Sequence, residues 1–449
     1  MRKDREEKEI LALNAFDPAQ ASALDASLRD AIQRRRRSFG SASVLFYQEP
    51  IRMERAEGVW MYDTEGRRYL DLYNNVPSVG HSHPRVVEAI RRQVGLLNTH
   101  TRYLNGVVDA YAERLLDAFP LEINRLVLTC TGSEANDLAL RIAKTVTGKS
   151  GFIVTATAYH GNTAAVTDVS PSSHPGRSSP SHVRAVPGPE TFRNPTDDLG
   201  KRFAQSVGEA IADLEQSGVG LAALLVDTIF SSDGVYSDPP GFLMPAIELV
   251  RKRGGIFIAD EVQPGFGRTG AAMWGFARHR VVPDIVTMGK PMGNGFPMGG
   301  VAARAAHLDR FTDEVKYFNT FGGNPVAAAA GLAVLDIIRD EELLANALAV
   351  GSYTMNGLRE IGNRHPQIGD VRGAGLFIGL EFVHGRDREP APEIASLLIN
   401  RLRHRGILVG AAGPFGSTLK IRPPLCFTKD NADEFISACD EVLREICPP

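Results

Sequence analysis

The segment IADEVQPGFGRTG at Ile258–Gly270, followed by VTMGKPMGNG at Val286–Gly295, decides the fold of this chain. Each segment begins as a short apolar strand. Asp260 lies at the end of the first strand, and Lys290 follows the second strand, next to a glycine. Open α/β sheets place their ligands at the carboxyl ends of the strands. We therefore expect Asp260 and Lys290 in one crevice, with room for a flat ligand. A purely structural ion pair is the alternative interpretation.

Short apolar runs between about Arg125 and Met288 extend this pattern. Strands are expected in RLVLTC, GFIVTAT, LAALLVD, GIFIAD and DIVTMG. These runs are apolar throughout, which indicates burial on both faces and is typical of a mostly parallel sheet covered by helices. The fold class is therefore α/β, with a large domain built on a mostly parallel central sheet and a smaller α+β C-terminal domain.

The expected boundaries divide the chain into three parts. Residues 1–80 form an N-terminal segment with a helix and short strands that belongs to the small domain, 81–325 form the large ligand-binding domain, and 326–449 form the small C-terminal domain. Two strands around a turn are expected in WMYDTEGRRYLDL, a helix is expected from Pro84, and the Ala/Leu-rich stretch after Pro325 predicts a long helix. The basic run Arg34–Arg37 indicates a solvated helix end, with a nucleic-acid contact as the alternative.

Composition excludes several classes of protein. The 449 residues carry 50 Lys+Arg against 53 Asp+Glu, which gives a net charge of -3. No strong single-sign electrostatic field therefore indicates nucleic acid or an anionic membrane as the main partner. No apolar stretch reaches the roughly 18 residues of a transmembrane helix, and the start MRKDREEKEI is unlike a signal peptide. The 4 cysteines lack metal-ligand spacing, so we expect a cytoplasmic protein. We expect no metal at His81 and His83, since no third ligand is spaced nearby.

A phosphate site is expected where TGS at Thr131–Ser133 joins a strand to the helix SEANDLALRIAK. Free backbone N–H groups and the helix dipole at such a junction attract an anion. A plain N-cap is the alternative interpretation. The stretch GAGLFIG at Gly373–Gly379 imitates a dinucleotide fingerprint, but it precedes a strand pattern and lacks the helix that would hold a pyrophosphate.

From about Ser43 to the C-terminus the chain resembles the class III aminotransferases, pyridoxal 5'-phosphate (PLP) enzymes of fold type I. The likeness rests on TGSEAND, YHG, DEVQ, GK, TFGGNP and RGAGL, in the family's order. It implies that Lys290 forms the Schiff base with PLP and that Asp260 faces the pyridine nitrogen. It further implies cofactor contacts by Gly132, Ser133, Tyr159, Val262 and Gln263, and by Thr320 across a homodimer with shared active sites.

Two positions depart from the dual-specificity members of that family. Lys420 in LKIRPP stands where they have an arginine for a substrate carboxylate, and Ser232 stands where they have a glutamate, with Asp227 replacing the leading glutamate of that segment. An ammonium does not replace the bidentate guanidinium fork. Within the family the chain is most similar to the ethanolamine-phosphate phospho-lyases, which share this lysine and also match Arg102 in THTRYL.

The resemblance and these departures imply a phospho-lyase that eliminates phosphate from a small phosphorylated amine, such as O-phosphoethanolamine, to give acetaldehyde, ammonia and phosphate. Arg102 and Lys420 are the candidate contacts to the substrate phosphate, because charge develops on that leaving group. Each of them has a solvated surface charge as its alternative. A class III amine or ω-amino acid:pyruvate transaminase is the alternative enzyme. A catalytically silent cofactor-binding regulator fused to a DNA-binding module is a third interpretation, for which the retained Lys290 and Asp260 leave little room.

Overall fold

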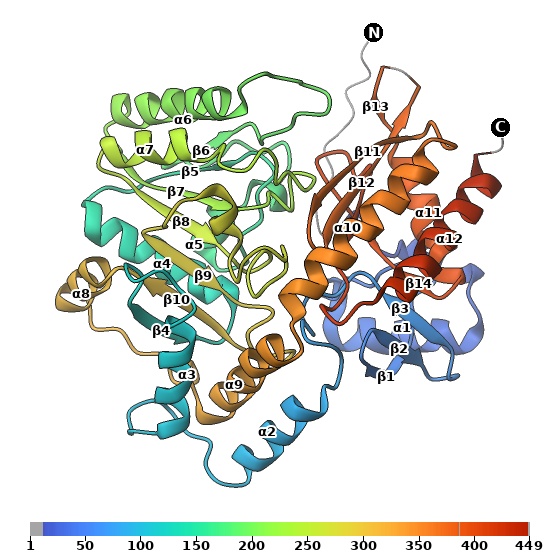
Figure 1. Cartoon of the computed structure of the whole chain (residues 1–449), viewed down its shortest axis with the longest axis horizontal. Helices are drawn as coiled ribbons and strands as arrows, with labels where there is room; N and C mark the ends of the chain where they lie inside the picture. Colours follow the sequence, from blue (N-terminus) through green and yellow to red (C-terminus); the bar gives the residue numbers. More distant parts are fainter. Residues whose placement is uncertain (1–11, 386, 448–449) are drawn as a thin grey trace.

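The computed structural model describes residues 12–385 and 387–447. Its largest sheet has seven strands in the order β4-β10-β9-β8-β7-β5-β6 (Figure 1). These are β4 (Arg125–Thr129), β5 (Gly151–Thr155), β6 (Val183–Val186), β7 (Leu221–Asp227), β8 (Ile256–Asp260), β9 (Ile285–Met288) and β10 (Gly299–Ala303). Strand β10 is antiparallel to both neighbours, and the other pairings are parallel. The expected α/β fold with a mostly parallel central sheet is confirmed.

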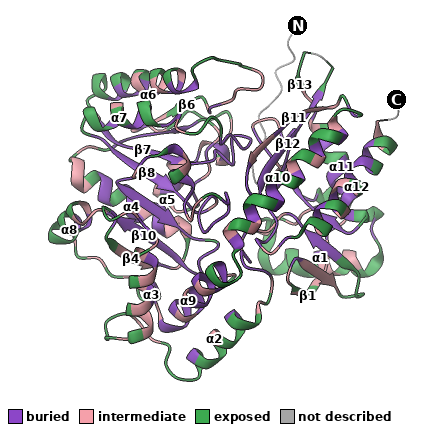
Figure 2. Ribbon diagram, viewed as in Figure 1, coloured by how far each residue is buried: buried purple, intermediate pink, exposed green. Residues whose placement is uncertain are grey.

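Both faces of this sheet are buried, as the uniformly apolar strands predicted (Figure 2). Phe257 and Val286 belong to the core that includes α6 (Leu199–Gln216) and α7 (Met244–Lys252). Their neighbours Ile258 and Ile285 belong to the opposite core, with α4 (Gly132–Thr147) and α8 (Ala305–Glu314). Successive side chains of a strand point to opposite faces, so a sheet covered on both sides needs apolar residues at every position.

A second sheet lies in the C-terminal part of the chain. It comprises β11 (Ile368–Ala374), β12 (Phe377–His384), β16 (Thr418–Ile421) and β15 (Gly410–Ala412) in that order, with β13 (Glu389–Pro390) on β12. Helix α10 (Leu343–Gly362) packs on β11 and on α12 (Lys429–Ile446), which in turn packs on α11 (Pro392–His404). The GAGLFIG stretch lies in the β11–β12 hairpin, so it precedes a strand as expected.

The N-terminal strands share a sheet with a C-terminal strand. Strands β1 (Met53–Glu57), β2 (Trp60–Asp63) and β3 (Arg68–Asp71) continue into β14 (Ile407–Leu408), which is parallel to β3. The strands expected in WMYDTEGRRYLDL are confirmed. The first eleven residues of the expected N-terminal segment lie outside the described residues.

The remaining helices complete the two units seen in Figure 1. They are α1 (Ala26–Phe39), α2 (Pro84–Val94), α3 (Gly106–Leu116), α5 (Ala164–Asp168) and α9 (Pro325–Asp340), with short 3-10 turns at Pro18–Ala23, Gly40–Ala42, Pro171–Ser173 and Gly275–His279. Helices beginning at Pro84 and Pro325 were both expected. Helix α9 packs against α2 and α3 rather than on the C-terminal sheet. The arginines of the Arg34–Arg37 run are exposed on α1.

Candidate active site

The carboxyl ends of β7, β8 and β9 bring the candidate residues to one edge of the large sheet. Asp260 ends β8, opposite Asp227 at the end of β7 and opposite Thr287 of β9. Lys290 follows β9 by two residues. The sequence predicted this arrangement, because Asp260 and Lys290 each follow an apolar strand of the same sheet.

The Asp260 carboxylate is buried and held by three groups. Asn136 Nδ2 donates to Oδ2 at 3.0 Å, His160 Nδ1 lies 2.7 Å from the same oxygen, and the Val262 backbone N–H donates to Oδ1 at 3.0 Å. Hydrogen bonds of this kind fix the direction of the carboxylate. The sequence did not predict His160 and Asn136 as partners of Asp260, although they lie within the YHG and TGSEAND motifs.

Lys290 lies at this edge of the large sheet. Its side chain is exposed, whereas Gly289, Pro291 and Met292 around it are buried. The surrounding protein and the positive charge of Arg422 lower the pKa of Lys290 to about 8, and Asp260 opposes this shift by favouring the charged ammonium. At pH 7 about a tenth of amines with such a pKa are neutral, against fewer than about one in a thousand at the ordinary pKa of about 10.4, and the neutral form is the one that a nucleophile or base requires.

Two glycines allow close packing beside Lys290. A Cβ added to Gly132 would lie 2.9 Å from Val262 Cγ2, and one added to Gly289 would lie 3.1 Å from the Gly132 backbone. Neither glycine has a positive φ, so close approach is the constraint at these positions. Val262, Gly132 and Gly289 therefore form a packed surface beside Lys290.

The first turn of α4 provides the candidate anion site. The helix begins at Gly132, and the N-cap Thr131 accepts a hydrogen bond from the Glu134 N–H at 3.1 Å through its hydroxyl. The N-cap interpretation is therefore correct for Thr131, while Gly132 and Ser133 remain the first-turn residues whose N–H groups lack helical acceptors. Ser133 Oγ accepts from the Asn162 N–H at 3.2 Å, which joins this turn to the segment after Tyr159 and His160.

Gln263 joins the large sheet to the C-terminal sheet. Its amide donates to Ser231 Oγ at 2.7 Å, and its oxygen accepts from Asn75 Nδ2 at 3.3 Å and from Arg422 Nη1. Arg422 is buried on the segment after β16 and was also missed by the sequence reasoning. Tyr159 is half-buried directly before His160.

Lys420 is buried on β16, with the cross-strand partners Gly379 and Gly410. Burial and the neighbouring charge of Arg422 place the pKa of Lys420 well below its ordinary value, and Lys290 adds to this effect. These mutual influences place Lys420 with the groups at the sheet edge. The interpretation of Lys420 as a solvated surface charge is wrong.

Thr320 and Arg102 lie on an exposed part of the chain instead. The Arg102 guanidinium carbon lies 3.9 Å from the centroid of the Phe318 ring, and both Arg102 and Thr320 are exposed. Asn319 links this segment to α4, because its amide donates to Glu134 Oε2 at 2.9 Å. The structure thus brings Arg102 and Thr320 to one surface near the beginning of α4.

Other expectations concern metals and membranes. His81 Nε2 lies 2.7 Å from Asp71 Oδ2, and His83 Nε2 lies 3.0 Å from Glu341 Oε1, so each histidine has its own carboxylate partner. Among the described residues no group of three or more potential ligands could hold a metal ion. Within the same residues no helix is long and apolar enough to cross a membrane.

The chain is similar to several known proteins. The family model described as aminotransferase class-III matches residues 45–443. A Caenorhabditis elegans protein named ethanolamine-phosphate phospho-lyase homolog 1 is 38% identical over 448 residues, which cover 95% of this chain and 96% of that protein. A Drosophila melanogaster protein named alanine–glyoxylate aminotransferase 2-like is 38% identical over 435 residues, covering 94% and 88% of the two chains.

A solved structure is also similar to this chain. It is a phospholyase from Arthrobacter in complex with phosphoethanolamine, and it is 43% identical to this chain with a TM-score of 0.90. The match covers 94% of this chain and 100% of that one. Similarity therefore extends over almost the whole of both proteins.

Proposed function

The chain belongs to the class III aminotransferase family, and on that premise we propose that it is a PLP-dependent phospho-lyase acting on a small phosphorylated amine such as O-phosphoethanolamine. The observation that carries the proposal is Lys420. Lys420 is a buried amine on which the charge of Lys290 acts; in its protonated form it suits a phosphate, and it replaces the arginine fork that suits a carboxylate. The phosphoethanolamine complex of the Arthrobacter relative supports the same substrate class.

The residues at the sheet edge fit PLP. Lys290 would hold the cofactor covalently, Asp260 would pair with its ring nitrogen, and the first turn of α4 at Gly132 and Ser133 would bind its phosphate. Val262 and Gly289 offer the flat surface that a planar ring needs. Gln263 and Tyr159 would make the remaining ring contacts, and Thr320 would reach the phosphate of the partner subunit in a homodimer.

The reaction divides between a proton transfer and a bond cleavage. When bound, PLP supplies an electron sink for the charge left on the amine-bearing carbon. Lys290, as a neutral amine, removes the proton from that carbon. The bond between the neighbouring carbon and the phosphate oxygen then breaks, and the electron pair leaves with the phosphate. Water converts the unsaturated amine that remains into acetaldehyde and ammonia.

Cations on the leaving phosphate are the main requirement of this elimination. Burial depresses the pKa of Lys420. A phosphate dianion beside it favours the charged ammonium, so substrate binding itself restores the cation that the reaction needs. Arg102 is the second candidate contact to the phosphate, and its permanent charge complements that of Lys420.

We also propose the three-part organisation 1–80, 81–325 and 326–449. We further propose a cytoplasmic location, in line with free thiols at Cys130, Cys426, Cys439 and Cys447.

A class III amine or ω-amino acid:pyruvate transaminase is the second candidate function, favoured by the similarity to the alanine–glyoxylate aminotransferase 2-like protein. Keto-acid dependence separates the two. The phospho-lyase releases phosphate without pyruvate, whereas sustained turnover that requires pyruvate and releases no phosphate supports the transaminase.

A further inference from the structure

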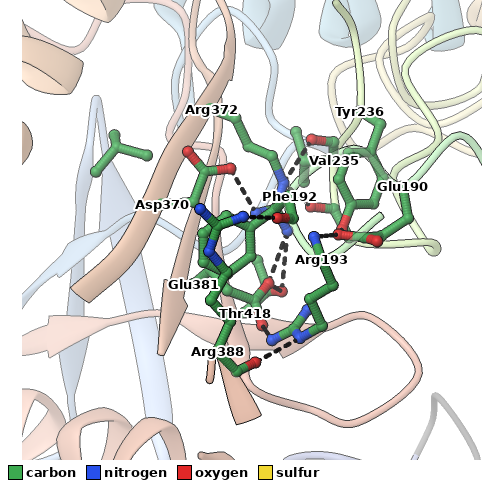
Figure 3. A network of polar contacts seen from close by, with 12 residues as sticks. Glu190, Phe192, Arg193, Val235, Tyr236, Asp370, Arg372, Glu381, Arg388 and Thr418 are labelled. Atoms are coloured by element: carbon green, nitrogen blue, oxygen red, sulfur yellow. Dashed lines mark hydrogen bonds and ion pairs between the residues drawn. The ribbon is translucent and has the colours of Figure 1, made fainter. Parts of the chain in front are cut away.

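A buried carboxylate, Glu381, connects three strands of the C-terminal sheet (Figure 3). Its Oε2 accepts from Arg372 Nη2 on β11 at 2.8 Å and from Thr418 Oγ1 on β16 at 2.5 Å, and its Oε1 accepts from Ser417 Oγ at 2.6 Å. Burial alone would raise the pKa of Glu381, but Arg372 and Arg193 lower it to about 2. The carboxylate is therefore charged at every working pH and holds its donors permanently.

The same network reaches the large sheet. Arg372 Nε donates to the carbonyl oxygens of Gly234 at 2.9 Å and Val235 at 3.1 Å, on the segment that follows β7, and the Arg372 guanidinium lies 4.3 Å from the Tyr236 ring centroid. Arg193 Nη2, from the loop after β6, donates to Glu381 Oε1 at 2.6 Å. Figure 3 shows these side chains converging between the C-terminal strands and the segments that carry Arg193 and Tyr236. Glu381 and Arg372 therefore fix the C-terminal sheet against the segment after β7.

Lys420 lies on the strand that this network holds. Thr418 and Lys420 are two residues apart on β16, so their side chains point to the same face of the sheet. Thr418 pairs with Glu381, and Lys420 pairs with Gly379. A Cβ added to Gly379 would lie 3.1 Å from the Gly234 oxygen, so the face that carries Lys420 packs directly on the segment after β7.

We propose that Glu381 and Arg372 are positioning residues for phosphate recognition, which hold β16 so that Lys420 faces the substrate phosphate; this inference rests on the proposed function. Within the described chain, the Lys420 ammonium has no hydrogen bond or ion pair of its own. Its place is therefore set by its backbone, and the Thr418–Glu381–Arg372 contacts fix that backbone relative to the large sheet. The network acts through Lys420 and does not touch the substrate.

Three variants test this role by steady-state kinetics and by inhibition with inorganic phosphate. Thr418→Val removes one hydrogen bond to Glu381, Glu381→Gln removes its charge, and Thr418→Ser keeps the hydroxyl as the conservative variant. We expect the first two to raise both the KM for O-phosphoethanolamine and the Ki of inorganic phosphate about tenfold, because a displaced Lys420 loses its charge-assisted contact to the phosphate, which is worth about that factor. Thr418→Ser should behave like wild type, and the Kd of unphosphorylated ethanolamine should change less than about twofold in all three.

A matched control separates positioning from general destabilisation. Asp440 is also a buried carboxylate of the C-terminal part, and it binds His365 Nε2 at 2.7 Å and Arg364 Nη2 at 3.0 Å, away from β16. Asp440→Asn should leave the Ki of inorganic phosphate unchanged, even where it lowers the melting temperature. A wild-type Ki in folded Thr418→Val overturns the positioning role, as does an equal loss of affinity for both amines.

The wild-type enzyme distinguishes the two levels of the proposal. If it releases no phosphate from O-phosphoethanolamine, the proposed function is wrong. If it releases phosphate but Thr418→Val and Glu381→Gln bind inorganic phosphate as wild type does, the proposed function stands and the positioning role is wrong. Lys420→Met serves as the positive control for loss of phosphate affinity.

Discussion

His160 Nδ1 lies 2.7 Å from Asp260 Oδ2, and both side chains are buried at the carboxyl edge of the large sheet. An ionised carboxylate only accepts hydrogen bonds, so Nδ1 carries the proton in this pair. Asn136 donates to the same oxygen. These hydrogen bonds restrict the direction of the free lone pairs of Asp260, which we propose to bind the ring nitrogen of PLP.

Replacement of Asp260 and of His160 should have graded effects. Asp260→Asn removes the charge that keeps the proposed ring nitrogen protonated, and we expect kcat to fall about 10²-fold or more, as for loss of other preorganised electrostatic contacts. His160→Ala removes only the orienting contact, so a loss of about tenfold is expected. Both are measured as kcat of the PLP-loaded enzyme. Equal activity of Asp260→Asn and wild type would exclude the assigned role.

Lys290 should be the residue that holds the cofactor. Borohydride reduction of the PLP-loaded enzyme, followed by peptide mass spectrometry, should place the cofactor's mass on the peptide that contains Lys290. Lys290→Ala should lose this adduct and all turnover, while Lys201→Ala, on the exposed face of α6, keeps both. An adduct on another lysine in the wild-type enzyme would contradict the assignment.

The capture of PLP by the apoprotein should depend on pH in a defined window. Only the neutral amine of Lys290 is nucleophilic, and its pKa is lowered to about 8. The capture rate should therefore rise with pH up to about 8 and level off above it. A lysine with an ordinary pKa of about 10.4 would give a rate that keeps rising past pH 10. Arg422→Gln should move the midpoint to higher pH, because Arg422 contributes to the depression.

Thr320 should serve the active site of the partner subunit. Mixing Lys290→Ala chains with Thr320→Ala chains gives heterodimers with one intact site and one doubly altered site if Thr320 acts across the interface. Activity of isolated heterodimers should then exceed that of both parent homodimers. If verified heterodimers show no gain, Thr320 acts within its own chain.

Neutralising the phosphate contacts should affect only phosphorylated substrates. Arg102→Ala and Lys420→Met each remove a charge-assisted contact, and kcat/KM for O-phosphoethanolamine should fall at least about tenfold. Binding of unphosphorylated ethanolamine should hardly change. Arg91→Ala, an exposed arginine on α2, is the control and should have no effect. An unchanged kcat/KM in either test variant would remove that residue from the phosphate site.

The sequence predicts the parts of this structure that depend on local pattern. The apolar runs that became β7, β8 and β9 are long enough to show burial on both faces. Strand β10 was missed, because its sequence GGVAA is rich in glycine and alanine, which are depleted in strands. Strand β14 has only two residues, and its partner β3 is far away in the sequence, so no period can reveal it.

The sequence likewise predicts one part of the candidate site and not the other. Asp260 and Lys290 end neighbouring strands, so strand order alone brings them to one edge. His160 meets Asp260 only through tertiary packing across 100 positions of sequence, and no spacing predicts that contact. The Glu381 network likewise depends on the register of three strands. The hydrophobic pattern of each strand does not predict that register.

Incubation of the wild-type enzyme with O-phosphoethanolamine and no keto acid decides whether the protein is a phospho-lyase. We expect continuous turnover in which phosphate, ammonia and acetaldehyde appear in equal amounts, and in which Lys290→Ala is inactive. Release of no phosphate, together with turnover only after pyruvate is added, would contradict it.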